Sequence, residues 1–305
     1  MLCATQRGLL ILRKLKELAP VAELSVFSFP EEPWEPPFLE AIRDQTLAFG
    51  GAFFEARRVG IERWKPFWEA VGADLMLIVS WRFLVPPEVY QRPRLGTVVF
   101  HDSLLPAYRG FSPTVWAMIN GENHTGTTLF RISEEVDAGD IVDQEPVPIG
   151  AEETIATVME RVTRTYLRIL ERNLEGLLKG TAPRRPQDHA RATYTCRRTP
   201  EDNQINWHAS TRTILNLIRA VTAPYPGAGT LLGHRRITIW AAQAAVPALE
   251  YAGRIPGRVV EFRPGVGAVV LTGDGSVLVT RAQVEGGPAV CAADVLNSLS
   301  MTLGR

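Results

Sequence analysis

The chain has 305 residues, of which 46% are hydrophobic and 22% charged, so it is long and apolar enough to build a sizeable core and is not a disordered protein. Lys plus Arg and Asp plus Glu number 33 each, so the chain lacks the global positive field that gathers nucleic acid. Its three cysteines, Cys3, Cys196 and Cys291, are too few and too widely spaced for a disulfide framework or a zinc cluster. We therefore expect reduced thiols and no metal site.

The sequence shows no signal for export or for membrane insertion. No uninterrupted apolar run approaches the roughly 20 residues of a membrane-spanning helix. The N-terminus has no basic segment followed by an apolar stretch and a small-residue cleavage site. These features predict a cytoplasmic protein with no membrane association.

The first 80 residues alternate short apolar runs with helical patterns. Helices are predicted over 9–18 and 37–48, and strands over 25–29 and 75–80. This alternation is typical of a doubly wound parallel sheet. Residues 2–5 leave little room for a first strand before the first helix.

A proline-rich segment over 29–38 sets glutamates and prolines around Trp34. It is either a rigid solvated loop or a lid over a site. An ordinary exposed connection is the more common arrangement.

Two titratable residues stand out because each follows a predicted strand. TVVF (97–100) ends at His101, and TTLFRI (127–132) leads to an acidic turn that contains Asp137. An ionised carboxylate stabilises the charged form of a nearby imidazole, so this pair can shuttle a proton during acyl transfer. Taken alone, a histidine that ends a strand and an aspartate that begins a turn more often have only structural roles.

The second half of the chain predicts a further domain. Apolar residues at helical spacing between 155 and 177 form one face of a long helix that packs on the sheet. The polar, proline-containing segment over 181–203 has the composition of a linker, and its paired arginines either lie in solvent or reach a phosphate. Short strands follow at regular spacing, which predicts a small all-β barrel.

The surroundings of His101 and Asp137 carry a resemblance to a known family. The motifs are Ser103-Leu104-Leu105-Pro106, Tyr108-Arg109-Gly110 and Asp137-Ala138-Gly139, and the segments over 194–207 and 218–232 continue it. In this order they resemble the folate-dependent formyltransferases. The similarity is greatest to the enzymes that act on nucleotide-linked amino sugars, followed by the methionyl-tRNA formyltransferases.

The resemblance implies a fold, a cofactor and a set of site residues. The fold is a Rossmann-like parallel-sheet domain over 1–183, a linker over 184–203 and an OB-like β-barrel domain over 204–305. The cofactor is 10-formyltetrahydrofolate, and the catalytic pair is His101 and Asp137. The implied cofactor-binding residues are Trp81, Arg82, Phe83, Leu84, Val136 and Gly139. The implied substrate-binding residues are Ser103, Leu105, Pro106, Arg109, Gly110 and Arg197.

One position departs from the family pattern. The resembled enzymes have an asparagine two residues before the histidine, and its amide helps to bind the formyl oxygen, whereas this chain has Val99. Valine donates no hydrogen bond, and removal of one such donor typically lowers a rate by about 10²–10³. Ser80, Arg82 and Asn123 are polar residues in neighbouring segments, but sequence alone assigns the missing role to none of them.

Three functions follow from these observations. The first is an N-formyltransferase that acts on a primary amine of a small molecule, with a nucleotide-linked amino sugar favoured. The second is a methionyl-tRNA formyltransferase, which the balanced charge and the acidic segment over 29–38 disfavour. The third is a folate-binding relative without catalysis, which Val99 supports.

Overall fold

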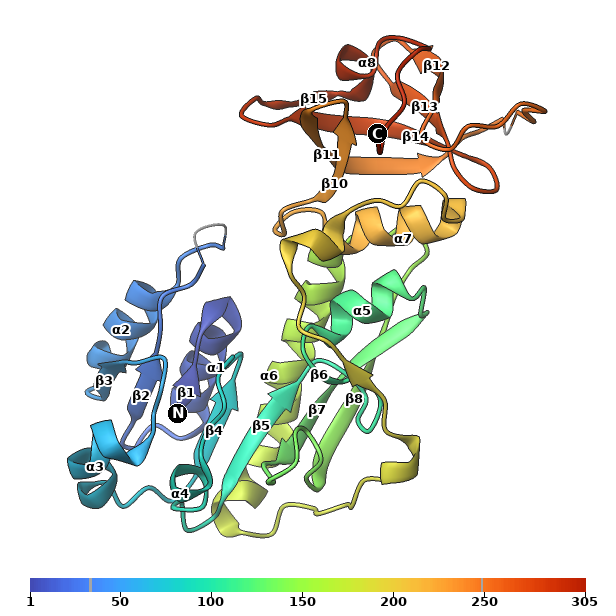
Figure 1. Ribbon diagram of the computed structural model, residues 1–305. Helices are drawn as coiled ribbons and strands as arrows, with labels where there is room; N and C mark the ends of the chain where they lie inside the picture. The colour runs from blue at the N-terminus through green and yellow to red at the C-terminus, as the bar shows by residue number, and fades with distance from the viewer. Residues whose placement is uncertain (33–34, 248) are drawn as a thin grey trace. The chain divides into compact units, whose positions relative to one another are not determined.

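The computed structural model describes residues 1–32, 35–247 and 249–305 (Figure 1). Trp34, at the centre of the proline-rich segment, therefore lies outside the described residues. The chain divides into two compact units. The first unit comprises residues 1–113, 125–147 and 160–195. The second unit comprises residues 114–124, 148–159 and 196–305.

A seven-stranded sheet forms the centre of the first unit, in the order β3-β2-β1-β4-β5-β7-β8 (Figure 1). The strands are β1 (Leu2–Cys3), β2 (Ser25–Ser28), β3 (Ala52–Glu55), β4 (Met76–Val79), β5 (Thr97–His101), β7 (His124–Arg131) and β8 (Ile141–Pro148). The first five strands pair in parallel, and their order is the one expected of a doubly wound sheet. β7 instead pairs antiparallel with β5. The predicted parallel-sheet α/β fold is confirmed, with one antiparallel addition beside β5.

Helices cover both faces of this sheet. They are α1 (Thr5–Leu18), α2 (Leu39–Ala48), α3 (Ile61–Ala70), α4 (Pro87–Tyr90) and α6 (Ile155–Lys179). α1 begins four residues before the predicted start, because the central strand β1 is only two residues long. Phe100 of β5 stacks on Tyr166 of α6, at a distance of 4.5 Å between ring centroids. Because side chains alternate along a strand, His101 belongs to the opposite face.

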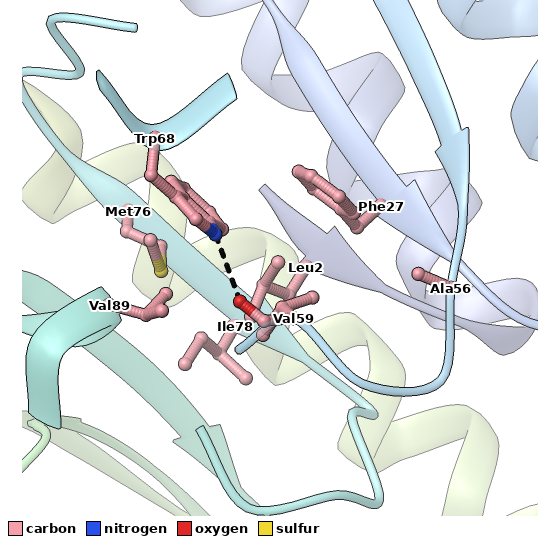
Figure 2. Packing of buried hydrophobic residues seen from close by; sticks show 8 residues of the cluster. All are labelled: Leu2, Phe27, Ala56, Val59, Trp68, Met76, Ile78 and Val89. Carbon is pink, nitrogen blue, oxygen red and sulfur yellow. Dashed lines mark hydrogen bonds between the residues drawn. The ribbon is translucent and has the colours of Figure 1, made fainter. Parts of the chain in front are cut away.

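The core beneath α3 and α4 holds the aromatic rings of Phe27 and Trp68 among aliphatic side chains (Figure 2). Leu2, Met76 and Ile78 of the sheet pack there against Trp68 of α3 and Val89 of α4. The indole Nε1 of Trp68 donates to the Val59 carbonyl at 2.9 Å, so burial of this ring leaves no donor unpaired. This cluster fixes the position of β4 next to β5.

The second unit is dominated by a mostly antiparallel sheet in the order β10-β11-β14-β13-β12, with β15 paired to β14. Its strands are β10 (Ala228–Leu232), β11 (Arg235–Ala244), β12 (Val259–Arg263), β13 (Gly267–Leu271), β14 (Ser276–Val284) and β15 (Ala289–Cys291). The helices of this unit are α5 (Pro113–Ile119), α7 (Thr211–Val221) and α8 (Ala292–Val295). The prediction of a β-rich C-terminal domain is confirmed. No helix among the described residues is both long and apolar enough to cross a membrane.

The segment predicted as a linker is paired to the first unit over part of its length. Arg185 forms an antiparallel bridge with Ile141, and β9 (Tyr194–Thr195) pairs in parallel with β6 (Arg109–Gly110). Short 3₁₀ helices lie at His189–Arg191 and Pro200–Asn203. Residues 185–195 therefore form an ordered strap along the first unit.

Candidate active site

His101 is the last residue of β5 and is 8% exposed. Its Nε2 lies 2.7 Å from the Tyr108 carbonyl oxygen, and its Nδ1 lies 3.6 Å from Oδ2 of Asp137. Because a carbonyl only accepts, Nε2 carries the hydrogen of the neutral ring. Nδ1 is then the nitrogen that can take up a proton, and it faces a carboxylate that would stabilise the resulting charge.

Asp137 reaches His101 by a route that the sequence pattern did not predict. β7 runs antiparallel to β5, with Arg131 opposite Val98, so β7 ends at the opposite edge of the sheet from His101. The acidic turn that follows must fold back to bring its carboxylate to the imidazole. Asp137 follows a strand, as the sequence predicts, but this strand is antiparallel to β5, and the turn brings the carboxylate back to the imidazole.

Several contacts hold Asp137 in its turn. The backbone N–H of Gly110 donates to Oδ2 at 2.8 Å, and Asp137 has a φ of +52°. The amide of Gln187, from the strap, donates to the carbonyls of Asp137 and Gly139, each at 2.8 Å. A Cβ at Gly139 would lie 1.8 Å from the Arg131 carbonyl oxygen, so only glycine fits there. Gly139 thus shapes the turn.

Arg109 has a different position from the one that the resemblance implies. Its side chain is 1% exposed, and its guanidinium donates to Gln187 and to the hydroxyl of Tyr194. It also lies 3.3 Å from Nδ1 of His189. These partners all belong to the strap, so the structure turns the guanidinium inward. Arg109 supports Gln187 and the Gly110–Asp137 contact instead of facing an acceptor.

The motif Ser103-Leu104-Leu105-Pro106 makes contacts inside the protein that order the turn next to His101. Ser103 Oγ donates to the Ala107 carbonyl at 2.6 Å, and Leu105 packs against Phe130 and Ile141. The Pro106 carbonyl accepts from the N–H of Thr193 in the strap at 3.3 Å. This ordered turn places the Tyr108 carbonyl against His101.

The segment after β4 is aromatic and partly exposed. The rings of Trp81 and Phe83 both pack edge-on against Phe29, with centroids 5.1 and 4.9 Å away. Arg82 binds both carboxylate oxygens of Glu35, at 2.7 and 2.5 Å. Leu84 is 85% exposed. The proline-rich segment is thus joined to this region through Glu35.

The same edge of the sheet holds polar atoms that lack partners. Over the described part of the chain, Thr5 Oγ1, Ser80 Oγ and Trp81 Nε1 are buried and make no hydrogen bond. All three residues follow the carboxyl ends of the neighbouring strands β1 and β4. Buried polar groups are almost always paired, so these three atoms are available to a ligand or a water molecule. The aromatic rings and these donors together suit a flat heterocycle that carries amide groups, such as a pterin.

Next to His101, Asp102 lies in a buried charge network that belongs to the opposite face. The Arg7 guanidinium binds both of its carboxylate oxygens, at 2.5 and 2.6 Å, and the Tyr166 hydroxyl donates to Oδ1. Burial opposes ionisation, but the charge and hydrogen bonds of Arg7 and the bond from Tyr166 outweigh it, and the pKa of Asp102 falls below its usual value. Burial and the Asp102 charge raise the pKa of Tyr166. This network anchors the end of β5.

Val136 and Arg197, like Leu84, are implied ligand residues that lie on the surface, whereas Val99 does not. Val136 is 51% exposed in the acidic turn, and Arg197 is exposed in the second unit. Val99 packs with Leu105 and Phe130 in the apolar cluster below His101. Position 99 thus supplies no hydrogen-bond donor to the site.

Sequence reasoning missed three contributors to the site. These are the Tyr108 carbonyl, the Gln187 amide and the Tyr194 hydroxyl. A carbonyl leaves no signal in a sequence. Gln187 and Tyr194 lie in a polar segment whose composition predicts only a linker.

An imidazole–carboxylate pair at a strand end of an open α/β sheet is an arrangement that acid–base chemistry can use. The sequence model of the formyl transferase family matches residues 13–174, and that of the formyl transferase C-terminal domain matches residues 197–300. The chain belongs to the formyl transferase family, whose members transfer formyl groups and use 10-formyltetrahydrofolate.

Solved structures share this fold at low sequence identity. HypX from Aquifex aeolicus, in complex with tetrahydrofolic acid, is similar with a TM-score of 0.63 and 21% identity over 89% of this chain and 46% of that one. This chain thus spans about half the length of HypX. WlaRD, a sugar 3N-formyl transferase, is similar with a TM-score of 0.65 and 17% identity over 94% of this chain and 97% of that one. An N-formyltransferase from Helicobacter canadensis gives a TM-score of 0.65 and 16% identity, over 91% and 98%.

Proposed function

We propose that this protein is a cytoplasmic N-formyltransferase that acts on a primary amine of a nucleotide-linked amino sugar. The observation that carries the proposal is the pair formed by His101 and Asp137, with Nδ1 and Oδ2 3.6 Å apart, in a chain of the formyl transferase family. Several contacts unrelated to ligand binding hold this pair in place, so the geometry is set before any substrate arrives.

His101 is the proposed proton carrier. Its Nε2 donates to the Tyr108 carbonyl, so Nδ1 is the atom that takes the proton lost by the acceptor amine. The same nitrogen then gives this proton to the folate nitrogen that the formyl group leaves. Asp137 stabilises the imidazolium formed between these two transfers, while Gly110 holds the carboxylate. When bound, 10-formyltetrahydrofolate supplies the formyl carbon, which leaves a folate nitrogen and bonds to the acceptor nitrogen.

We assign the folate to the carboxyl edge beside β4. Trp81, Phe83 and Leu84 offer aromatic and apolar surface there, and Val136 and Gly139 belong to the turn that carries Asp137. Arg82 contributes through its backbone, because Glu35 holds its side chain. Ser103, Leu105, Pro106, Arg109 and Gly110 act by positioning the reactive pair.

Two observations support the acceptor class. WlaRD is a sugar 3N-formyl transferase studied with dTDP, and the Helicobacter canadensis enzyme was studied with dTDP-3-aminofucose. The chain also has no net charge, which disfavours tRNA. Arg197, exposed in the second unit, is the proposed contact for the nucleotide phosphates.

A formyl-transfer assay tests this function. Purified protein is incubated with 10-formyltetrahydrofolate and with either UDP- and dTDP-linked 3-amino and 4-amino sugars or methionyl-tRNA, and product mass and folate absorbance are followed. We expect a formylated nucleotide sugar that the His101→Ala variant does not produce. Formylation of methionyl-tRNA alone would overturn the acceptor class. Tight folate binding without product from any amine would show a non-catalytic relative, as Val99 would allow.

A further inference from the structure

Val99 leaves the proposed reaction without one hydrogen-bond donor. A formyl oxygen gains negative charge as the amine attacks, and enzymes stabilise that charge with preorganised donors. Val99 instead packs with Leu105, Phe130 and Ile141. Another donor has to reach the same oxygen if the chain is an active transferase.

Of the three polar residues that the sequence offers as the missing donor, Ser80, Arg82 and Asn123, the structure leaves one. Arg82 is held by both carboxylate oxygens of Glu35, and its side chain is 35% exposed. The side-chain oxygen of Asn123 lies 2.7 Å from Nδ1 of His124. Ser80 remains, because its hydroxyl is buried and has no hydrogen-bond partner among the described residues.

Ser80 and His101 lie at the same end of two neighbouring parallel strands. β4 and β5 pair in parallel, with Ile78 opposite Val99. Ser80 directly follows β4, at the same end of this strand pair at which His101 ends β5. Ser80 also adopts a φ of +53°, a conformation that residues other than glycine rarely take and that gathers at functional sites.

The Ser80 hydroxyl can turn toward a ligand at little cost. Its Oγ is buried while the residue as a whole is partly exposed, so a step of about 120° in χ1 to another staggered well moves the hydroxyl. No hydrogen bond breaks in this step, because none is present. The neighbouring Trp81 Nε1 also lacks a partner, but its ring is packed against Phe29 and Phe83 and is not free to rotate in this way.

We propose that the Ser80 hydroxyl donates a hydrogen bond to the formyl oxygen and takes the place of the amide that Val99 lacks. This inference rests on the proposed function. Ser80 keeps its proton throughout, so the transfer of the formyl group and of the amine proton is unchanged. Ser80 is then a catalytic residue of this chain that the family motif does not contain.

The test removes the hydroxyl in two ways and restores a donor in a third. Ser80→Ala removes it directly, and Ser80→Gly removes it while suiting the positive φ, so that a folding defect in the alanine variant does not end the test. The matched control is Ser28→Ala, which removes another buried unpaired hydroxyl at the end of β2, at a residue that is fully buried. The rescue variant combines Ser80→Ala with Val99→Asn.

Turnover is measured with the acceptor found above. Binding of 5-formyltetrahydrofolate, a stable probe, is measured by calorimetry, and the stretch of its ¹³C-labelled formyl carbonyl by difference infrared spectroscopy. We expect both Ser80 variants to lose roughly 10²-fold in kcat while the probe still binds within about threefold. The carbonyl band moves to higher frequency without the hydroxyl, Ser28→Ala matches wild type, and Val99→Asn restores at least part of the lost rate.

The two proposals fail in different ways. If wild type transfers formyl groups and both Ser80 variants keep the full rate and the same carbonyl band, the Ser80 assignment is overturned and the proposed function stands. Loss of rate in Trp81→Phe, with none in the Ser80 variants, overturns it as well. If wild type binds the probe but transfers nothing, the proposed function fails, and the carbonyl band alone decides whether Ser80 contacts the formyl oxygen.

Discussion

The two halves of the sheet in the first unit differ in how far their buried polar groups find hydrogen-bond partners within the protein. On the β7–β8 side most of the buried and half-buried side chains pair with the protein itself, namely Thr125, Thr127, Thr128 and Gln144, although Nε and Nη2 of Arg131 at the end of β7 have no partner over the described residues. On the β1–β4 side Thr5, Ser80 and Trp81 have polar atoms with no partner over the described residues. A polar group satisfied inside the protein contributes to stability, whereas an unsatisfied one is available to a ligand. His101 lies on β5, where the two halves meet.

The largest effect is expected at this junction. His101→Ala removes the proposed proton carrier and should lower kcat by roughly 10³-fold, since general acid–base catalysis supplies factors of this order. Thermal unfolding should be nearly unchanged. The control is His124→Ala, which removes an exposed histidine with no proposed role. Equal turnover of the His101 variant and wild type would show that the His101–Asp137 pair does not take part in the reaction.

Asp137→Asn should have a smaller effect on the same reaction. The amide oxygen can still accept from Gly110, but it carries no charge to stabilise the imidazolium. We expect kcat to fall by about 10²-fold with KM for folate little changed, measured by steady-state kinetics. A rise in KM without a fall in kcat would instead make the turn a binding element only.

Asp102→Asn tests the paired charge network of Arg7, Asp102 and Tyr166 and should lower the stability of the protein. The Arg7 and Asp102 side chains are 16% and 15% exposed, between a surface pair and a fully buried one, so we expect a loss of about 2 kcal/mol in unfolding free energy. The folded pKa of Asp102 is below its unfolded value of about 3.9. The ionised pair therefore stabilises the protein above that pH, and its contribution is lost as the pH falls through the folded pKa.

Chemical denaturation as a function of pH measures both parts of this prediction. Wild type should lose stability below about pH 4, and Asp102→Asn should lose less over that range. Asp74→Asn is the control, since its pair with Arg94 is exposed and should change nothing measurable. Identical pH profiles for wild type and Asp102→Asn would show that the network does not carry this stability.

The smallest effect is expected in the second unit. Arg197→Ala should raise KM for the nucleotide-linked acceptor by about tenfold with kcat unchanged, as expected for loss of one charge-assisted phosphate contact. The exposed Arg235 of the same unit provides the control variant Arg235→Ala. An unchanged KM in Arg197→Ala would remove Arg197 from the acceptor site.

The sequence predicted the parallel sheet and the β-rich C-terminal part well, because both depend on apolar residues that recur at strand or helix spacing within short segments. It placed His101 correctly, since a short β-branched run ends there. It did not indicate the direction of β7, because strand pairing depends on contacts far apart in the chain.

The same limit explains the errors around the site. Arg109 belongs to a family motif, but only its buried partners Gln187 and Tyr194 show that it points inward. Those partners lie about 80 residues away in a segment with the composition of a linker. Likewise, the unpaired hydroxyl of Ser80 becomes visible only when its surroundings are known.

Hydrogen–deuterium exchange with and without 5-formyltetrahydrofolate tests most directly whether folate binds at the carboxyl end of β4, where Ser80 and Trp81 have unpaired polar atoms. We predict protection of residues 80–84 and 101–110 on binding. A cavity of about 590 Å³ at the opposite edge, lined by Tyr90, Thr97, Arg131 and Arg184 among others, offers the competing location. Protection confined to residues 87–97 and to the neighbourhood of Arg184 would contradict the account.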